Sequence, residues 1–200
     1  MTRRSRPEMI ADTRAKLIAA ARKAFGEQGY AEASMDDFTA EAGLTRGALY
    51  HHFGGKKGLL EAVIQQIDAE MAQRLRAISS AAPTPGEGFV QENIGYVEMA
   101  LEPEIQRILL RDGPAVLGDP SRWPSADGCI AAIQKSVEDL QEAGLVRNDI
   151  DAEVVARLIS GASMDAALWI ANAADPRSAS RKALPVFKAL LEGLLRREAT

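Results

Sequence analysis

The sequence SMDDFTAEAGLTRGALYHHF, from Ser34 to Phe53, contains two short helical segments on either side of a glycine. Ser34 precedes an acidic residue by three positions, an arrangement that caps the start of a helix, and the segment ends at Gly43. Thr45 occupies the capping position of the second segment, which runs to about residue 53. Two short helices joined at a tight turn are a helix-turn-helix pattern.

The apolar residues of this stretch are spaced to pack inward, against Leu17, Ala21 and Phe25 of a helix expected at residues 9–28. The inward residues are Phe38, Leu44, Leu49 and Phe53. The residues left outward on the second helix are Thr45, Arg46, Gly47, Tyr50 and His51. Such a helix fits the major groove of DNA with its N-terminal residues nearest the base edges. Its free amides and positive dipole end favour phosphates.

The rest of the chain predicts an all-α protein. A long helix is expected from Lys56, and a loop at residues 79–88. Proline and glycine punctuate the helices that follow. These are expected at residues 87–101, 103–118, 124–144, 151–173 and 178–197.

Composition agrees with a folded, cytoplasmic protein. Apolar residues make up 46% of 200 residues, which is enough to bury a core. Cys129 is the one cysteine, so an internal disulfide and a thiolate metal cluster are excluded. No apolar run approaches the roughly 20 residues that span a bilayer, and no apolar segment follows the basic N-terminus, so neither a membrane span nor a secretory signal is expected.

Charge is distributed unevenly along the chain. The net charge is −4, yet residues 1–58 carry ten Lys/Arg and seven Asp/Glu, a balance of +3. The remaining residues carry fourteen Lys/Arg and twenty-one Asp/Glu, a balance of −7. A basic head on an acidic body indicates that one end approaches an anionic partner.

The stretch from Thr13 to Leu60 resembles the N-terminal domain of the tetracycline-repressor (TetR) family. Two departures are Phe38, where the family usually has a smaller aliphatic residue, and Lys57, where an acidic residue is common. The matching pieces are the helix end AFGEQGY at 24–30, Ser34-Met35, AGLT at 42–45, Gly47, LYHHF at 49–53, Lys56 and Leu59-Leu60.

The resemblance implies a DNA-binding domain at residues 1–57 and specific roles within it. Arg46 and Gly47 would face base edges, with Arg46 able to bond a guanine through two hydrogen bonds. The basic N-terminal residues Arg3, Arg4 and Arg6 would reach an adjacent groove or the backbone. The expected phosphate contacts are Ser34, Thr45, Tyr50, His52 and Lys56.

Simpler interpretations compete with these roles. Arg46 would then be a solvated surface charge, and Tyr50 a packing residue. The pair His51-His52 is not expected to hold a metal, because adjacent helix positions point about 100° apart and no cysteine or carboxylate cluster joins them.

Residues 58–200 would form an effector-binding and dimerisation domain, according to the same resemblance. The stretch RILLRDGPAVLG at 107–118, followed by Trp123, is similar to one subgroup of such domains. The last two helices, at 151–173 and 178–197, would pair with a second subunit, since the apolar surface of the final helix is broader than one stripe. The alternative is a plain buried helix in a monomer. Pro185 would lie in the first turn of that helix or kink it.

The expected effector pocket consists of large or polar residues on predicted core faces. Such pockets are mostly apolar and aromatic, with a few polar groups that orient the ligand, so a hydrophobic effector is expected. The alternative is that most of these residues are ordinary core or loop residues. The candidates are Tyr96, Met99, Arg111, Asp112, Trp123, Met164, Asp165 and Trp169.

The sequence thus predicts a homodimeric, ligand-responsive repressor that binds a palindromic operator and needs no cofactor or metal. An enzyme is the rival class. Both histidines fall in the predicted reading helix, and no glycine-rich phosphate loop, nucleophile elbow or paired metal motif is present. A third hypothesis is a DNA-binding head on a body that binds a protein instead of a small ligand.

Overall fold

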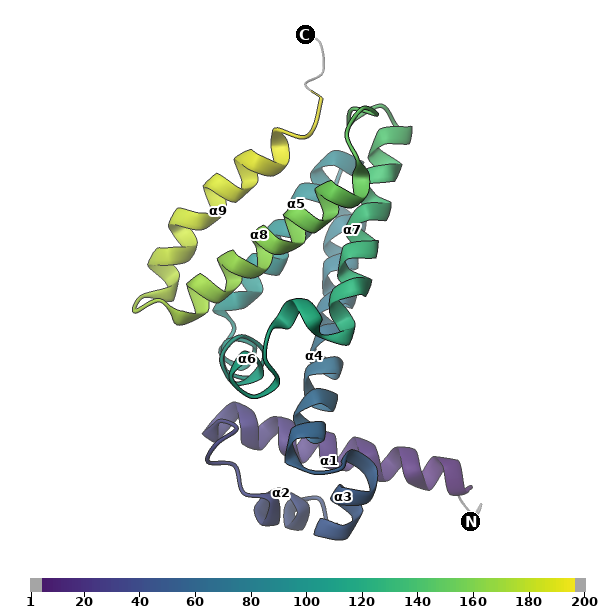
Figure 1. Ribbon diagram of the computed structural model, residues 1–200, viewed down its shortest axis with the longest axis vertical. Coiled ribbons are helices and arrows are strands. Elements are labelled where there is room, and N and C mark those ends of the chain that lie inside the picture. The colour runs from purple at the N-terminus through teal and green to yellow at the C-terminus, as the bar shows by residue number, and fades with distance from the viewer. Residues whose placement is uncertain (1–4, 197–200) are drawn as a thin grey trace.

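Three helices form a small head at one end of the molecule (Figure 1). They are α1 (Arg6–Gln28), α2 (Met35–Glu41) and α3 (Arg46–Phe53) in a computed structural model that describes residues 5–196. The side chains of Ser34 and Thr45 cap α2 and α3, as the sequence predicts. The helix-turn-helix prediction is therefore confirmed at the level of fold.

An apolar cluster holds the three head helices together. Leu17 and Phe25 of α1, Phe38 of α2 and Leu49 of α3 are all buried, and the rings of Phe25 and Phe38 meet edge to face with centroids 5.9 Å apart. Burial of each such side chain contributes roughly 1.5–3 kcal/mol, so this cluster fixes the angle between the helices. Leu44 and Phe53 are partly buried against it.

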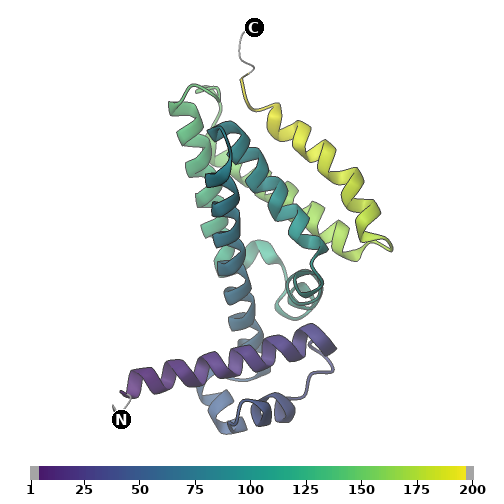
Figure 2. The ribbon, with the colours of Figure 1, turned by 180° about the vertical axis from the view of Figure 1, so that it is seen from behind.

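The helix α4 (Lys56–Ala81) runs from the head into the body, and α1 lies across its foot (Figure 2). The corner between α3 and α4 depends on Gly58. A Cβ atom at this position would lie 2.0 Å from the backbone oxygen of Phe53, far inside any permitted contact. A side chain at Gly58 would therefore push α4 away from α3.

The body is a bundle of helices packed around α4 and α5. α7 packs against α8, α5 packs against α4, α8 and α9, and α8 packs against α9. The residues that the structure describes contain no strand, although Val146 and Leu195 form one isolated β-bridge. The elements are α5 (Pro85–Glu98), η1 (Met99–Leu101), η2 (Ile105–Asp112), α6 (Gly113–Leu117), η3 (Pro120–Arg122), α7 (Pro124–Glu142), α8 (Ala152–Asn172) and α9 (Pro176–Glu192).

Two predicted segments differ in detail. The loop expected at 79–88 is present but covers only residues 82–84, because α4 continues to Ala81 and Thr84 caps α5, which starts at Pro85. The proline stands in the first turn, where its missing N–H costs nothing. The helix expected at 103–118 is mainly the π-helix η2, an uncommon form that is frequent at functional sites.

Several large apolar side chains are exposed on α8 and α9. Leu158 is 70% exposed and Trp169 52% on α8, and Leu190 is 63% exposed on α9. α8 is long and apolar enough to cross a membrane by composition, but a helix of a soluble bundle passes the same test, and α8 lies within this bundle. Pro185 lies inside α9, past its first turn.

Candidate DNA-binding surface and effector site

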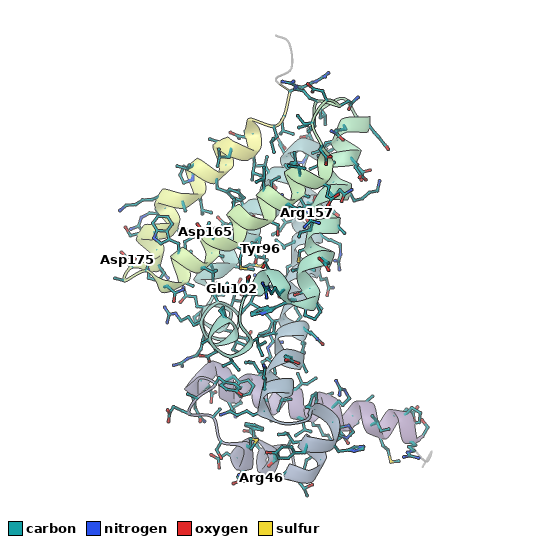
Figure 3. The ribbon with its side chains drawn as sticks, in the orientation of Figure 1. Arg46, Tyr96, Glu102, Arg157, Asp165 and Asp175 are labelled. Atoms are coloured by element: carbon teal, nitrogen blue, oxygen red, sulfur yellow. The ribbon has the colours of Figure 1, made fainter. Side chains whose placement is uncertain are left out.

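The outward face of α3 lies at the tip of the head. Arg46, Gly47, Tyr50 and His51 are exposed, and Figure 3 shows Arg46 at the end of the molecule farthest from the body. The structure brings these predicted residues together on one face, while Leu49 points into the core. This face is free to enter a groove.

Arg46 is held by a neighbour on α2. Its Nη2 donates to Oδ2 of Asp36 over 2.8 Å, and its Nε pairs with Oδ1 of the same carboxylate. Both side chains are exposed, so the pair is of low strength. A guanine in the groove would have to replace Asp36 as the acceptor.

The caps of α2 and α3 leave hydroxyl groups at both helix starts. The Oγ of Ser34 accepts from the N–H of Asp37 over 3.4 Å, and the Oγ1 of Thr45 accepts from the N–H of Ala48 over 3.2 Å. Each hydroxyl retains an O–H donor, and each helix start carries partial positive charge. Both features suit a phosphate oxygen.

Lys56 contacts two residues of the head, Tyr30 and Ala31, which the sequence does not indicate. Its Nζ donates to the backbone oxygen of Ala31 over 3.3 Å and lies 4.6 Å from the centre of the Tyr30 ring. Burial lowers the pKa of Lys56, while Glu32 and Asp112 act in the opposite direction. An ammonium has three donors, so two remain for a phosphate.

The two histidines at the end of α3 lie against Arg14 of α1. Arg14 donates from Nη1 to the backbone oxygen of His52 over 2.8 Å and stacks 4.4 Å above the Phe53 ring. The His51 and His52 rings are 5.1 Å apart, and burial, followed by the charges of His51 and Arg14, lowers the pKa of His52. Residues 5–196 contain no group of three potential metal ligands.

Only part of the predicted basic N-terminal arm falls within the described residues. Arg3 and Arg4 lie outside the described residues. Arg6 is exposed as the first residue of α1, which is capped by Ser5.

Polar contacts tie the head to the π-helix η2. Asp112 accepts from the backbone N–H of Tyr30 over 2.7 Å, and Arg107 donates to the backbone oxygen of Glu27 over 3.0 Å. Arg22 of α1 donates to Glu104, just before η2, over 2.7 Å. The end of α1 therefore moves with η2 unless these bonds break.

Four predicted pocket residues lie within the body. The Tyr96 hydroxyl is 3.9 Å from the Met164 sulfur, joining α5 to α8, and Figure 3 shows Tyr96 among the body helices. Met99 is buried in the core. Trp123 packs over Gly113, where a Cβ atom would lie 2.6 Å from the Trp123 ring and 3.1 Å from the Ile64 side chain.

The other four predicted pocket residues belong to η2 and α8 of the same body but make other contacts or are exposed. Asp165 and Trp169 were expected on the core face of their helix but are exposed, because the buried face of α8 is formed by its neighbours at 163, 167 and 170. Arg111 donates from Nε to the backbone oxygen of Ala171 over 3.0 Å at the end of α8. Asp112 bonds Tyr30. These four do not converge on one site.

Asp68 is not among the pocket residues that the sequence predicts. This residue lies one turn after Ile64 and three residues before Met71, both buried on the inner face of α4. An acid within an apolar helical stripe is a readable signal. The Oδ2 atom of Asp68 is buried without a hydrogen-bond partner, as are Trp123 Nε1 and Ser163 Oγ.

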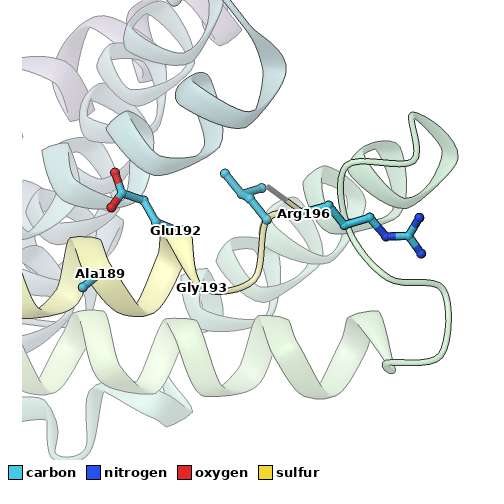
Figure 4. Close-up of a pocket in the computed structure, with 5 residues that line it drawn as sticks. Ala189, Glu192, Gly193 and Arg196 are labelled. Atoms are coloured by element: carbon cyan, nitrogen blue, oxygen red, sulfur yellow. The ribbon is translucent and has the colours of Figure 1, made fainter. Parts of the chain in front are cut away.

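A hollow of about 530 Å³ lies at the far end of α9 (Figure 4). It is lined by Ala189, Glu192, Gly193, Leu195 and Arg196. None of the predicted ligand residues is among them. This hollow is open to solvent and is no candidate for an enclosed effector site.

Two sequence profiles match the chain. The profile of bacterial regulatory proteins of the tetR family matches residues 17–63, and that of the tetracyclin repressor-like C-terminal domain matches residues 86–194. Among curated proteins, the HTH-type transcriptional regulator UidR of Escherichia coli K12 is 27% identical over 156 residues, 74% of this chain and 76% of UidR. TtgR of Pseudomonas putida is 33% identical over 110 residues, 54% of this chain and 52% of TtgR.

A solved structure is similar over almost the whole chain. It is a TetR-family transcriptional regulator from Pectobacterium atrosepticum, with 49% identity and a TM-score of 0.88 over 98% of this chain and 100% of that one. The head, the body and their connection thus have a counterpart at high identity.

Proposed function

The chain belongs to the tetR family of DNA-binding transcriptional regulators, and we propose that it is a homodimeric repressor that a small hydrophobic effector releases from its operator. The observation that carries this proposal is the exposed face of α3. The head that presents it is joined by hydrogen bonds to a body that matches the tetracyclin repressor-like C-terminal domain. The individual DNA contacts, the dimer and the response to a ligand are parts of the proposal.

The DNA contact divides into two kinds of interaction. Arg46, once released from Asp36, would read a guanine edge, and Gly47 would let the helix approach the bases closely. The hydroxyls of Ser34 and Thr45, with Tyr50, would hold phosphates. Phosphate contacts set register and affinity, and base contacts set sequence preference.

A second subunit would cover the apolar face of α8 and α9. An exposed apolar patch of this kind marks an interaction surface, and a two-fold dimer places the same patch on both sides. The two heads would then meet successive major grooves about 34–36 Å apart. A palindromic operator follows from that symmetry. Such a regulator acts in the cytoplasm.

The response to an effector would pass through η2. A ligand that favours one conformation of the body can move the heads only through the contacts that join the body to each head. The bonds from Asp112 to Tyr30 and from Arg107 to Glu27 supply that connection. The ligand therefore needs to displace η2 or α4 to change the spacing of the heads.

The test is a gel-shift screen. The full-length protein is mixed with DNA from upstream of its own gene, and small hydrophobic molecules are added one at a time. Retarded DNA that is released by a compound supports the proposal. Specific DNA binding that no small molecule changes, together with capture of a defined protein partner by the body, would favour the third hypothesis above.

A further inference from the structure

Four helices of the body bury polar groups next to one another. Asp68 comes from α4, Tyr96 from α5, and Met164 from α8, whereas Ser125 belongs to the first turn of α7. Burial raises the pKa of Tyr96, and the neighbouring Cys129 and Asp68 raise it further, so these groups lie close to the Tyr96 hydroxyl. Polar groups packed between apolar helices are costly unless they find hydrogen-bond partners.

Asp68 is the least satisfied member of the cluster. Its Oδ2 is buried and has no hydrogen-bond partner in residues 5–196. Burial raises the pKa of Asp68, and a hydrogen bond with Ser125 opposes that rise. No lysine or arginine acts on it, so the carboxylate has no cation of its own in the part of the chain described.

Two further buried atoms in this part of the body lack partners. Trp123 Nε1 and Ser163 Oγ are both without a hydrogen bond among the described residues. Trp123 packs beside Ile64, one helical turn from Asp68, whereas Ser163 lies on the buried face of α8 with Ala167 and Ile170. Asp68 Oδ2 and Trp123 Nε1 thus belong to neighbouring parts of the body, and each is a buried polar atom that requires a partner.

We propose that this cluster is the effector site and that the effector is a lipophilic amine whose ammonium pairs with Asp68. The inference rests on the proposed function and names its ligand class. The apolar part of the amine would lie against Tyr96, Trp123 and Met164. Aromatic faces also attract a cation, which adds to the attraction of the carboxylate. An anionic effector would meet Asp68 with no compensating cation.

Three probes with one skeleton test the charge preference. Phenylbutylamine, phenylbutanol and phenylbutyrate differ only in the head group, which is a cation, a neutral donor and an anion. Titration calorimetry on the full-length protein should show the amine binding at least about tenfold more tightly than the alcohol, and the acid more weakly than both. Equal affinities for amine and alcohol would overturn the proposal.

A variant of Asp68 assigns the preference to this residue. Asp68→Asn should remove the advantage of the amine over the alcohol and leave alcohol binding almost unchanged. Glu61→Gln is the matched control, because Glu61 is an exposed acid on the same helix. If Asp68→Asn keeps the preference for the amine, Asp68 is not its partner.

Trp123 gives a second readout that needs no change at Asp68. In Trp169→Phe protein the emission comes from Trp123 alone, since the chain has two tryptophans. Phenylbutylamine should change that emission with the same midpoint as in calorimetry. Binding without any change at Trp123 would place the ligand elsewhere and overturn the assignment.

Operator binding separates this inference from the proposed function. If the amine binds through Asp68 but leaves DNA affinity unchanged, the amine site stands and the effector role fails. If a compound of another class releases the DNA while Asp68→Asn has no effect on any probe, the repressor proposal stands and the amine site fails. Fluorescence anisotropy of labelled operator, measured with each compound, distinguishes these two outcomes.

Discussion

Charged substitution on the outer face of α8 and α9 should convert the protein from dimer to monomer. Leu158 and Leu190 are the residues to change, because they are 70% and 63% exposed in the single chain. Phe187 and Leu191 of α9, by contrast, are buried within the chain itself. Charges at those two positions would unfold the body instead of testing the dimer.

The expected effect follows from the exposed area. Full burial of a leucine contributes roughly 1.5–3 kcal/mol, so burying about two thirds of one contributes on the order of 1–2 kcal/mol. In a two-fold dimer each substitution acts twice, which doubles the loss to about 2–4 kcal/mol before the glutamate is desolvated. Since about 1.4 kcal/mol is a factor of ten, Leu158→Glu should raise the dimer dissociation constant at least about thirtyfold, and the double variant with Leu190→Glu about a thousandfold.

Sedimentation velocity at micromolar concentration is the measurement. The double variant should sediment as a monomer with an unchanged circular dichroism spectrum. Its operator affinity should fall, because a monomer contacts the operator with one head instead of two linked heads. Ala131→Glu is the control, since Ala131 is exposed on α7, away from α9 (Figure 1). A double variant that remains a dimer would refute the assignment of the interface to α8 and α9.

Four other substitutions address the head, its connection to the body, and the body. Arg46→Ala should cost on the order of 1–3 kcal/mol of specific DNA binding and relax one base preference, while Lys56→Ala should weaken all sequences alike and reduce the salt slope by about one; competition binding at several salt concentrations measures both. Asp112→Ala removes the acceptor of the Tyr30 N–H, a charged hydrogen bond worth roughly 1.5–3 kcal/mol, and amide exchange at Tyr30 should accelerate about tenfold or more. Asp68→Asn should flatten the pH dependence of stability. Because burial raises the pKa of Asp68, the folded chain binds this proton more tightly than the unfolded chain, and the wild-type free energy of unfolding falls as pH rises from 3.8 through the raised pKa; urea titrations at several pH values would show that slope disappear.

The head could be predicted from the sequence because local signals decide it. Ser34 and Thr45 are capping residues, and both caps form. Phe38 and Leu49 follow helical spacing and are buried as expected. The Arg46–Asp36 pair could not be foreseen, since the angle between α2 and α3 depends on the packing of the whole head.

The helices of the body could be predicted from the sequence, but the residues that face its interior could not. Asp165 and Trp169 were placed on the inner face of α8, yet they are exposed, because a helix with apolar residues on several sides does not reveal which side meets its own chain. The π-helix was missed for a related reason. A π-helix has no propensity signal of its own, and the partner of Arg111, the backbone oxygen of Ala171, lies 60 residues away in the sequence.

The packing of Trp123 suggests how the proposed amine site would reach the head. The Trp123 ring lies over Gly113 at a position where no side chain fits, so the two cannot move closer together. Asp112, the preceding residue, holds the backbone N–H of Tyr30 at the end of α1. A ligand that presses Trp123 toward Gly113 would therefore move the end of η2, and with it either α1 or the bond to Tyr30. The same contacts work in reverse, because linkage requires operator DNA to weaken effector binding by the factor by which the effector weakens DNA binding.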